Sequence, residues 1–259
     1  MAPEEETVEN WATSLVPIRS AVAWLALALA AVGCATTQQV KVRDQNYCPF
    51  LGADLCARLT PSTPPGRLSG AAIAGSGVPV ADLRYINPKA QWTQYHKVLL
   101  VPVTFWGGDD TKVSAKDQRM LCDYFYQALE KALSEKFEIV QEPGPGVMTI
   151  EVALVDAETA TPILRTISMV VPQARGLNTL KYLATGTYGF IGGAEAELKA
   201  EDSLTEEVLA AGVDRRVGGG GIKTAAQWQW GDAENAMNAW AAQVTTRFAA
   251  WTSGTPPES

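Results

Sequence analysis

An apolar run near the N-terminus divides the chain into a part that can join a folded domain and a part that cannot. Residues 20–33 read SAVAWLALALAAVG, with Arg19 before them and Cys34 after them. The run is too short to cross a bilayer as a helix, and an apolar core of this length behind a positive charge is typical of an export signal. We therefore predict that residues 1–33 are a signal peptide and that the folded part lies beyond them.

The signal ends in small residues before a cysteine, AVGC at 31–34. This pattern resembles the lipobox of bacterial lipoproteins, in which the cysteine is acylated and becomes the new N-terminus, although leucine is more typical than Ala31. The resemblance implies a palmitate-bearing anchor on Cys34. Ala35, in place of aspartate, resembles the signal for transfer to the outer membrane of Gram-negative bacteria. The alternative is an ordinary cleavable signal followed by an accidental cysteine.

The first residues, MAPEEETVEN, are acidic, whereas a signal peptide begins with a positive charge. A translation start at Val16 would remove this conflict, and residues 1–15 would then be an artefact of the assigned start. Acyl chains contribute about 0.8 kcal/mol per buried CH₂, so more than one chain on Cys34 gives stable attachment. Residues 34–46 are predicted to be the lipidated cysteine and a polar tether.

Three further cysteines, Cys48, Cys56 and Cys122, follow the predicted anchor. Export places them in an oxidising compartment, where disulfides form and persist. The spacing in CPFLGADLC therefore predicts a Cys48–Cys56 disulfide within an extended Pro- and Gly-rich segment at 47–84. A metal site is the weaker alternative, because His96 is the only histidine and no CxxC or HxxxH spacing is present. Three reduced thiols are the other alternative.

Two stretches have the periodicity of amphipathic helices. Ser114 is predicted to cap the first, with Asp117 three residues on, and Asp232 is predicted to cap the second. Apolar residues recur at helical spacing in both: Leu121, Phe125, Leu129 and Leu133 in the first, and Met237, Trp240, Ala241, Val244, Phe248 and Trp251 in the second.

Strand patterns lie between these helices and before them. KVLLVPVTF at 97–105 is a continuous apolar run in which Pro102 predicts an edge position or a bulge. FEIVQE and VMTIEVALVD, joined through PGPG, predict one hairpin. Residues 194–201 alternate small or apolar residues with charged ones, and EEVLAAGVDRR returns after a turn, which predicts a second hairpin.

Four acids gather on the charged side of this second hairpin: Glu195, Glu197, Glu201 and Asp202. Paired carboxylates can act as acid and base in hydrolysis or can bind a hard cation. The alternation favours a solvated face instead. We therefore assign no catalytic, cofactor-binding or metal-binding residues.

Residues 218–224, GGGGIKT, raise the question of a phosphate-binding loop. Such a loop needs G-x-x-x-x-G-K-[ST] between a strand and the helix it feeds. Here Ile222 separates Gly221 from Lys223, and the next predicted helix starts only at Asp232. Consecutive glycines are typical of a flexible joint. We therefore predict a connection that binds no nucleotide.

The order of elements predicts an α+β domain at 85–252, with a mainly antiparallel sheet and two principal helices packed on one face. Residues 253–259 are predicted to be a disordered tail. The chain has 259 residues, of which 47% are hydrophobic, enough for one globular core. Its net charge of −7 gives neither the electrostatic footprint of nucleic-acid binding nor a polybasic patch for anionic lipid.

Four stretches together carry a resemblance to a known family: FLGADLCARLTP, LRYINPKAQWTQYHKVLLVPV, GGAEAELKAEDSLTEEVLAAGVDRR and the Trp-bearing last helix. They resemble the bacterial lipoproteins of domain of unknown function 3313, over roughly residues 45–252. The resemblance implies an outer-membrane lipoprotein and brings no catalytic residues with it. The chain departs from the pattern at Glu206, where glycine is expected, and a non-glycine residue at positive φ is strained.

Function stays open between two classes. We favour a non-enzymatic envelope accessory protein on the periplasmic side of the outer membrane, which binds a protein partner or the cell wall and uses no cofactor, nucleotide or nucleic acid. A hydrolase would have to use His96, and no G-x-S-x-G motif accompanies it. Small-ligand binding is a further alternative that depends on a pocket.

Overall fold

The structure is a computed structural model that describes residues 37–42, 48–62, 81–108, 111–160, 192–218 and 229–257. The chain divides into two units, Met1–Ala35 and Thr36–Ser259, and all described residues belong to the second. The predicted signal peptide, Cys34 and the GGGGIKT stretch beyond Gly218 lie outside the described residues.

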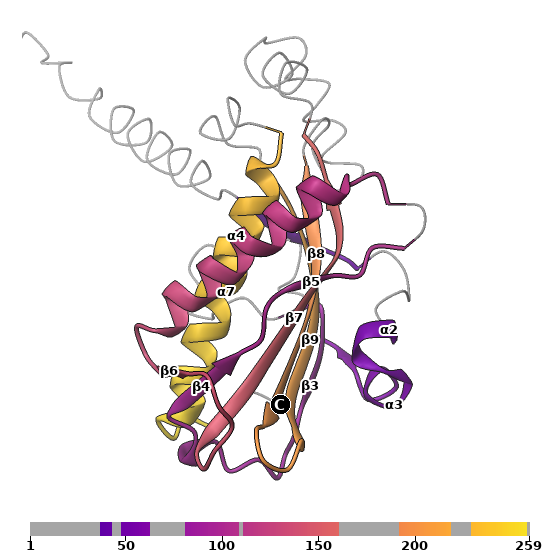
Figure 1. The fold of residues 1–259 in the computed structure, drawn as a ribbon. Coiled ribbons are helices and arrows are strands. Elements are labelled where there is room, and N and C mark those ends of the chain that lie inside the picture. The colour runs from indigo at the N-terminus through magenta and orange to yellow at the C-terminus, as the bar shows by residue number, and fades with distance from the viewer. Residues whose placement is uncertain are drawn as a thin grey trace, which may run out of the picture. The chain divides into compact units, whose positions relative to one another are not determined.

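A mixed sheet of nine strands forms the centre of the described fold (Figure 1). Three long strands, β7 (Val147–Glu158), β8 (Gly193–Asp202) and β9 (Val208–Gly218), pair antiparallel in that order. The shorter strands are β1 (Thr37–Val40), β2 (Thr60–Pro61), β3 (Leu83–Ile86), β4 (Lys97–Leu100), β5 (Thr104–Phe105) and β6 (Glu138–Val140). The main strand order is β2-β3-β9-β8-β7-β4-β6, with β1 beside β9 and β5 beside β7.

Two long helices, α4 (Ala115–Leu133) and α7 (Gly231–Thr252), lie along one face of the sheet (Figure 1). The other face carries the short helices α2 (Cys48–Leu51) and α3 (Ala53–Cys56), and a 3₁₀ turn, η2 (Trp92–Gln94), precedes β4. The predicted α+β class, with two principal helices on one face, is therefore confirmed. The sheet is mixed because β4 pairs parallel with both β6 and β7, and β5 with β7.

The first helix begins as its sequence predicts. Ser114 Oγ accepts a hydrogen bond from the Asp117 backbone N–H at 3.2 Å, and the Ser114 hydroxyl donates to Asp117 Oδ2 at 2.8 Å. These bonds satisfy a donor that the first helical turn would otherwise leave unpaired. The predicted stripe is buried along the helix: Leu121, Phe125, Leu129 and Leu133.

The second helix begins differently from the prediction, because Asp232 is not its cap. Trp230 is the N-cap residue and makes no capping bond through its side chain, and Asp232 lies in the first turn, completely buried. Its Oδ2 accepts from the Gly192 N–H at 2.8 Å, and a Cβ on Gly218 would lie 2.3 Å from its Oδ1. The Asp232 carboxylate therefore contacts the ends of β8 and β9 instead of capping the helix. The predicted apolar stripe holds, with Val244 half-buried and the others buried.

Two strand predictions are corrected. The hairpin between FEIVQE and VMTIEVALVD is wrong, because β6 and β7 both pair parallel with β4, which lies between them. The buried Val98 and Leu100 of β4 take this central place, which nearness in sequence could not reveal. The run at 97–105 is divided at Pro102, which has no N–H to donate, into β4 and β5, both beside β7.

Part of the predicted tether, 34–46, belongs to the sheet. Residues 37–40 form β1, which pairs antiparallel with β9 from Thr37↔Gly218 to Val40↔Arg215. The polar composition indicated a tether because β1 is not an apolar strand: all four of its residues are half-buried. The predicted 194–201 hairpin is present as β8 and β9.

The turn between β8 and β9 contains the one non-glycine residue at positive φ in the described part of the chain, Glu206 at φ 58°. This is the position where the family pattern predicts glycine. The Asp202 carboxylate organises the turn, because its Oδ1 accepts from the N–H groups of Leu204 and Thr205 at 3.0 and 2.9 Å.

We expect Glu206→Gly to raise the free energy of unfolding by up to about 1.5 kcal/mol. The left-handed conformation costs a non-glycine residue about 1–2 kcal/mol, and the greater freedom of glycine in the unfolded chain offsets about 0.5–1 kcal/mol of the gain. Urea denaturation measures the change. The matched control is Glu207→Gly, which should destabilise because Glu207 Oε1 accepts from Asn87 Nδ2 at 2.7 Å. Lower stability in Glu206→Gly would show that this account of the turn is wrong.

Candidate functional site

A cavity of about 90 Å³ lies between α7 and the neighbouring strands β3, β8 and β9. The strand residues along it are small: Ala196 of β8, and Ala210 and Gly212 of β9. Ala210 and Gly212 pair with Ile86 and Arg84 of β3, respectively. Because small residues occupy this part of the sheet, the side chains of α7 do not fill the space above it.

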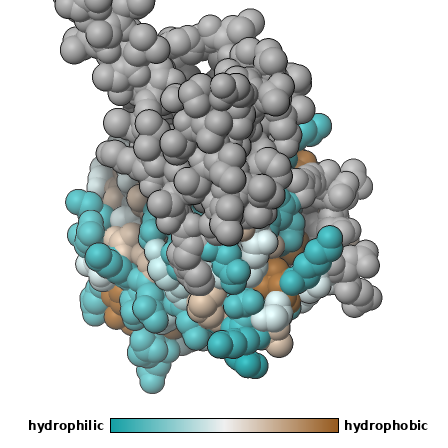
Figure 2. Space-filling model, turned by 90° about the horizontal axis from the view of Figure 1, so that it is seen from above, coloured by the Kyte–Doolittle hydropathy of each residue, from teal (hydrophilic) through white to brown (hydrophobic). Residues whose placement is uncertain are grey.

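The cavity wall is almost wholly apolar. Phe125 and Leu129 of α4 contribute to one side, and α7 contributes the aromatic residues Trp240, Phe248 and Trp251. Trp92 of η2 packs against this last pair, with ring centroids 5.7 Å from Phe248 and 4.7 Å from Trp251. The surface seen in Figure 2 is different, since its described part is mostly hydrophilic with small hydrophobic areas. The cavity is therefore a place where an apolar group could be held.

Among the polar wall residues that the structure describes, Glu197 has no hydrogen-bond partner for either oxygen, and Arg84 has one unpaired donor. Its Nη1 is buried and, among the described residues, has no hydrogen-bond partner. Leaving a charged donor buried without an acceptor costs more than the loss of a neutral hydrogen bond, and such groups are rare in folded proteins. Arg84 thus stands beside an apolar cavity with an N–H that lacks an acceptor.

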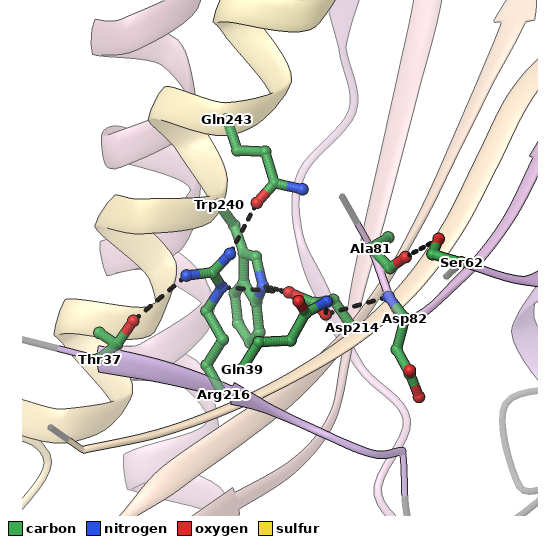
Figure 3. Close-up of polar contacts among 9 residues, drawn as sticks. All are labelled: Thr37, Gln39, Ser62, Ala81, Asp82, Asp214, Arg216, Trp240 and Gln243. Carbon is green, nitrogen blue, oxygen red and sulfur yellow. Dashed lines mark hydrogen bonds and ion pairs between the residues drawn. The ribbon is translucent and has the colours of Figure 1, made fainter. Parts of the chain in front are cut away.

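The other acid at the wall, Asp214, is fully engaged in a buried polar cluster (Figure 3). Its carboxylate accepts from Trp240 Nε1 at 2.7 Å, from Arg216 Nε at 3.1 Å, from the Asp82 N–H at 3.2 Å, and from Gln39 Nε2. Burial raises the pKa of Asp214, and the charge of Arg216 and the hydrogen bonds oppose that rise. Neutralised by Arg216, this acid adds little negative charge to the cavity.

Arg216 extends the cluster to the helix and to the N-terminal strand. Its Nη2 donates to Gln243 Oε1 of α7 at 2.7 Å, and its Nη1 donates to Thr37 Oγ1 of β1 at 3.3 Å (Figure 3). Gln243, like Trp240, lines the cavity. The cluster therefore fixes two wall residues of the cavity relative to the sheet.

The acids of β8 do not form the predicted solvated face. Glu195 is only 6% exposed and Glu197 only 1%, so that prediction is wrong for both, while Glu201 and Asp202 are half-buried. Leu51 and Leu55 of the two short helices pack with Ala211 and Val213 of β9 on this face of the sheet. Strand alternation separates two faces, but it does not reveal that a distant segment covers one of them.

The two buried acids of β8, Glu195 and Glu197, differ in their partners. Arg215 pairs with Glu158 at 3.0 Å and with Glu195 at 3.8 Å across the strands. Neither oxygen of Glu197 has a hydrogen-bond partner in the described part of the chain, and burial, followed by the charge of Glu195, raises its pKa to about 9. Glu197 is therefore a neutral acid at pH 7. Glu197 lines the cavity beside α7, although only 1% of its surface is exposed.

The remaining residues singled out in the sequence lie as follows. A disulfide joins Cys48 to Cys56, whose Cα atoms are 5.4 Å apart, and so links α2 to α3. Cys122 is a buried thiol, and burial, with the nearby Asp123, raises its pKa to about 11. His96 is exposed, directly before β4.

The described residues contain no group of three or more His, Cys, Asp or Glu side chains placed to hold a metal ion. No helix among them is long and apolar enough to cross a membrane.

The cavity and Arg84 were missed from the sequence. The signal that could have indicated them is the set of small residues, Ala196, Ala210 and Gly212, at positions that face a helix rich in large aromatic residues. Small residues there predict either close packing of the helix or a space. The sequence alone does not distinguish the two, because the distance from helix to sheet depends on contacts elsewhere.

The fold and cavity define an α+β domain with a small apolar pocket under its last helix. The model of a family described as a protein of unknown function, DUF3313, matches residues 74–244, and the chain belongs to this family. A search of curated proteins found no match.

Several solved structures are similar to the chain at low identity. A variant of the PelC dodecamer from Paraburkholderia phytofirmans is 9% identical, with 62% of this chain and 94% of that chain covered and a TM-score of 0.36. A second PelC dodecamer structure from this organism is 7% identical, with 62% and 95% covered and a TM-score of 0.34. A neuraminyllactose-binding hemagglutinin homolog from Helicobacter pylori is 12% identical, with 64% and 88% covered and a TM-score of 0.26.

We expect Glu197→Gln to stabilise the protein at pH 8 and to flatten the dependence of its stability on pH. Between the ordinary pKa of 4.5 and about 9, the unfolded chain releases a proton that the folded chain keeps. The free energy of unfolding therefore falls as pH rises, by at most about 1.4 kcal/mol per pH unit, and glutamine removes this contribution.

Urea denaturation at pH 5, 6, 7 and 8 measures the effect of that substitution. Glu201→Gln is the matched control, because Glu201 pairs with Lys199 at 3.1 Å and its loss should give no gain at pH 8. Equal pH slopes for the wild type and Glu197→Gln would show that Glu197 is ionised in the folded protein.

We also expect the double substitution Cys48→Ser, Cys56→Ser to lower the free energy of unfolding by about 2–3 kcal/mol, because a cross-link over a short loop restricts the unfolded chain by this amount. Denaturation of the reduced wild type should show a similar loss. Thiol alkylation with mass mapping is the direct check, and labelling of both cysteines without reductant would contradict the disulfide.

Proposed function

We propose that the protein is a lipoprotein anchored through Cys34 on the periplasmic side of the outer membrane, and that its domain is a non-enzymatic envelope accessory module that binds a protein partner or the cell wall. The observation that carries the proposal is the AVGC sequence at 31–34, directly after an apolar run of export-signal length. The Cys48–Cys56 disulfide supports it, because such bonds persist in oxidising compartments.

The charged groups of the domain support a binding role over catalysis. Arg215, Arg216 and Lys199 are each engaged with an acid of the same or a neighbouring strand. The Arg216–Asp214 pair is buried on both sides, and the removal of one partner of such a pair is strongly destabilising. These basic side chains therefore stabilise the fold.

The position of β1 gives the proposal a geometric consequence. The strand begins at Thr37, three residues after Cys34, and consecutive Cα atoms are 3.80 Å apart. An anchor on Cys34 therefore attaches within about 11 Å of the first paired residue of the sheet. A lipidated protein of this kind is held close against the membrane, with the end of β9 near Gly218, where β1 begins, on the membrane side.

Cys34→Ser should move the protein from the detergent-extracted membrane fraction to the soluble periplasm, because acylation needs the thiol. Ala35→Asp is the matched variant: it keeps the thiol and should leave the protein membrane-bound, but in the inner membrane. Fractionation with immunoblotting and mass analysis of the N-terminal peptide give the result. A soluble wild-type protein would overturn the anchor, and an Ala35→Asp variant that stays in the outer membrane would overturn the proposed sorting signal.

Small-ligand binding is a second candidate, and the cavity beside α7 is the observation that favours it. Ligand sites are concave and mostly apolar, with a few polar groups that fix orientation. The cavity has this composition, with Arg84 as its unpaired donor.

A further inference from the structure

The cavity beside α7 combines two features that a ligand must satisfy together. Its wall is apolar, with Phe125, Leu129, Val244 and Phe248 among the residues that line it. Arg84 lines the same cavity and carries a buried N–H without an acceptor. A purely apolar occupant would leave this donor unpaired, and a purely polar one would lose its hydration against an apolar wall. The fitting occupant has an apolar body and an acceptor.

Charge decides which kind of acceptor fits. The guanidinium of Arg84 carries a full positive charge and presents donors in a fork that matches a carboxylate. Two acids line the cavity, and neither repels an incoming anion strongly: Asp214 is paired with Arg216, and burial raises the pKa of Glu197 to about 9, which keeps it neutral. Charge-assisted hydrogen bonds are about twice as strong as neutral ones. A carboxylate is therefore favoured over a neutral hydroxyl.

The volume limits the apolar part. A water molecule takes up about 30 Å³ in the liquid, and a cavity of about 150 Å³ can bind benzene. A methylene group is similar in size to water, so about 90 Å³ admits roughly three of them. The cavity thus accommodates the start of an alkyl chain next to its head group, and a longer chain must continue outside it.

We propose that this cavity binds the carboxylate end of a fatty acid, with the carboxylate on Arg84 and the adjoining methylene groups against α7. The inference rests on the cavity and Arg84, and it is independent of the anchor at Cys34. It deepens the second candidate function by naming the class of ligand.

Binding is measured on the full chain carrying Cys34→Ser, in buffer without detergent, because detergent would compete for an apolar cavity. If the wild type proves soluble, it replaces this variant, so failure of the anchor proposal does not affect the test. The probes are acetate, butanoate, hexanoate, octanoate and decanoate, each paired with the alcohol of the same length. Ligand-observed NMR titration reports the dissociation constants.

We expect the affinity to rise about fourfold per methylene while the cavity fills, since each buried CH₂ contributes about 0.8 kcal/mol, and then to level off near butanoate, the acid whose alkyl part fills the cavity. Each carboxylate should bind at least tenfold more tightly than its alcohol, because a charged acceptor forms a stronger hydrogen bond with Arg84 than a neutral hydroxyl does. Equal affinity of octanoate and octanol would overturn the role of Arg84. A fourfold rise that continues to decanoate would overturn the assignment to this cavity.

Substitutions test the contact with Arg84 and the apolar cavity separately. Arg84→Gln should remove the preference for the carboxylate without lowering the thermal midpoint, because it removes a charge whose buried N–H has no acceptor. Ala210→Val should weaken binding of the acid and the alcohol alike, because it fills the cavity. Arg58→Gln is the matched control, since Arg58 is exposed and stacks on Tyr85, and it should change neither value.

The same variants give the outcomes that decide the proposal. Unchanged carboxylate preference in Arg84→Gln would overturn it, even if Ala210→Val fails to fold. Vesicles of phosphatidylglycerol form the last arm, because a membrane lipid also offers an alkyl chain and an anion. Saturable binding to these vesicles with no binding of octanoate would assign the cavity to a lipid surface and overturn the fatty-acid proposal.

Discussion

The buried carboxylate of Asp214 is the group on which the arrangement of the described fold depends. It accepts hydrogen bonds from the segment before β3, from α7, from Gln39 of β1 and from Arg216 of its own strand. A buried acid of this kind is tolerated only where donors replace the water it has lost. The position of α7 over the sheet, and hence the size of the cavity, follows from these bonds, because Trp240 and Gln243 belong to both the cluster and the cavity wall.

Sequence patterns predicted the elements that depend on local chemistry. The cap at Ser114, the stripe of Leu121 and Phe125, and the strand reversal around Glu206 all follow from residues within one or two turns of chain. Where a distant segment supplied the partner, the patterns misled. Asp232 looked like a cap but bonds Gly192, and Glu197 looked solvated but is buried. In each case the tertiary contact outweighed the local preference, and the sequence order does not contain that contact.

The candidate site depends on contacts between segments that are distant in the sequence, which is why it could not be predicted from sequence patterns. Its wall combines residues of α4, α7 and the strands β3, β7, β8 and β9, which lie far apart in the sequence. Arg84 in particular lies at the end of the segment that the sequence predicted to be extended, 47–84, and no pattern there singles it out. What distinguishes it is the absence of an acceptor for its buried N–H among the described residues, and that can be seen only when its surroundings are known.

Hydrogen bonds also connect β1, the strand nearest the proposed anchor, to the wall of the cavity. Thr37 and Gln39 lie three and five residues after the proposed lipid site and contact Arg216 and Asp214. The other partners of this ion pair, Gln243 and Trp240, form part of the cavity wall. β1 is therefore part of the sheet and not a separate tether. Because its side chains help satisfy the acid that positions α7, the segment nearest the proposed anchor is part of the structure that sets the dimensions of the cavity.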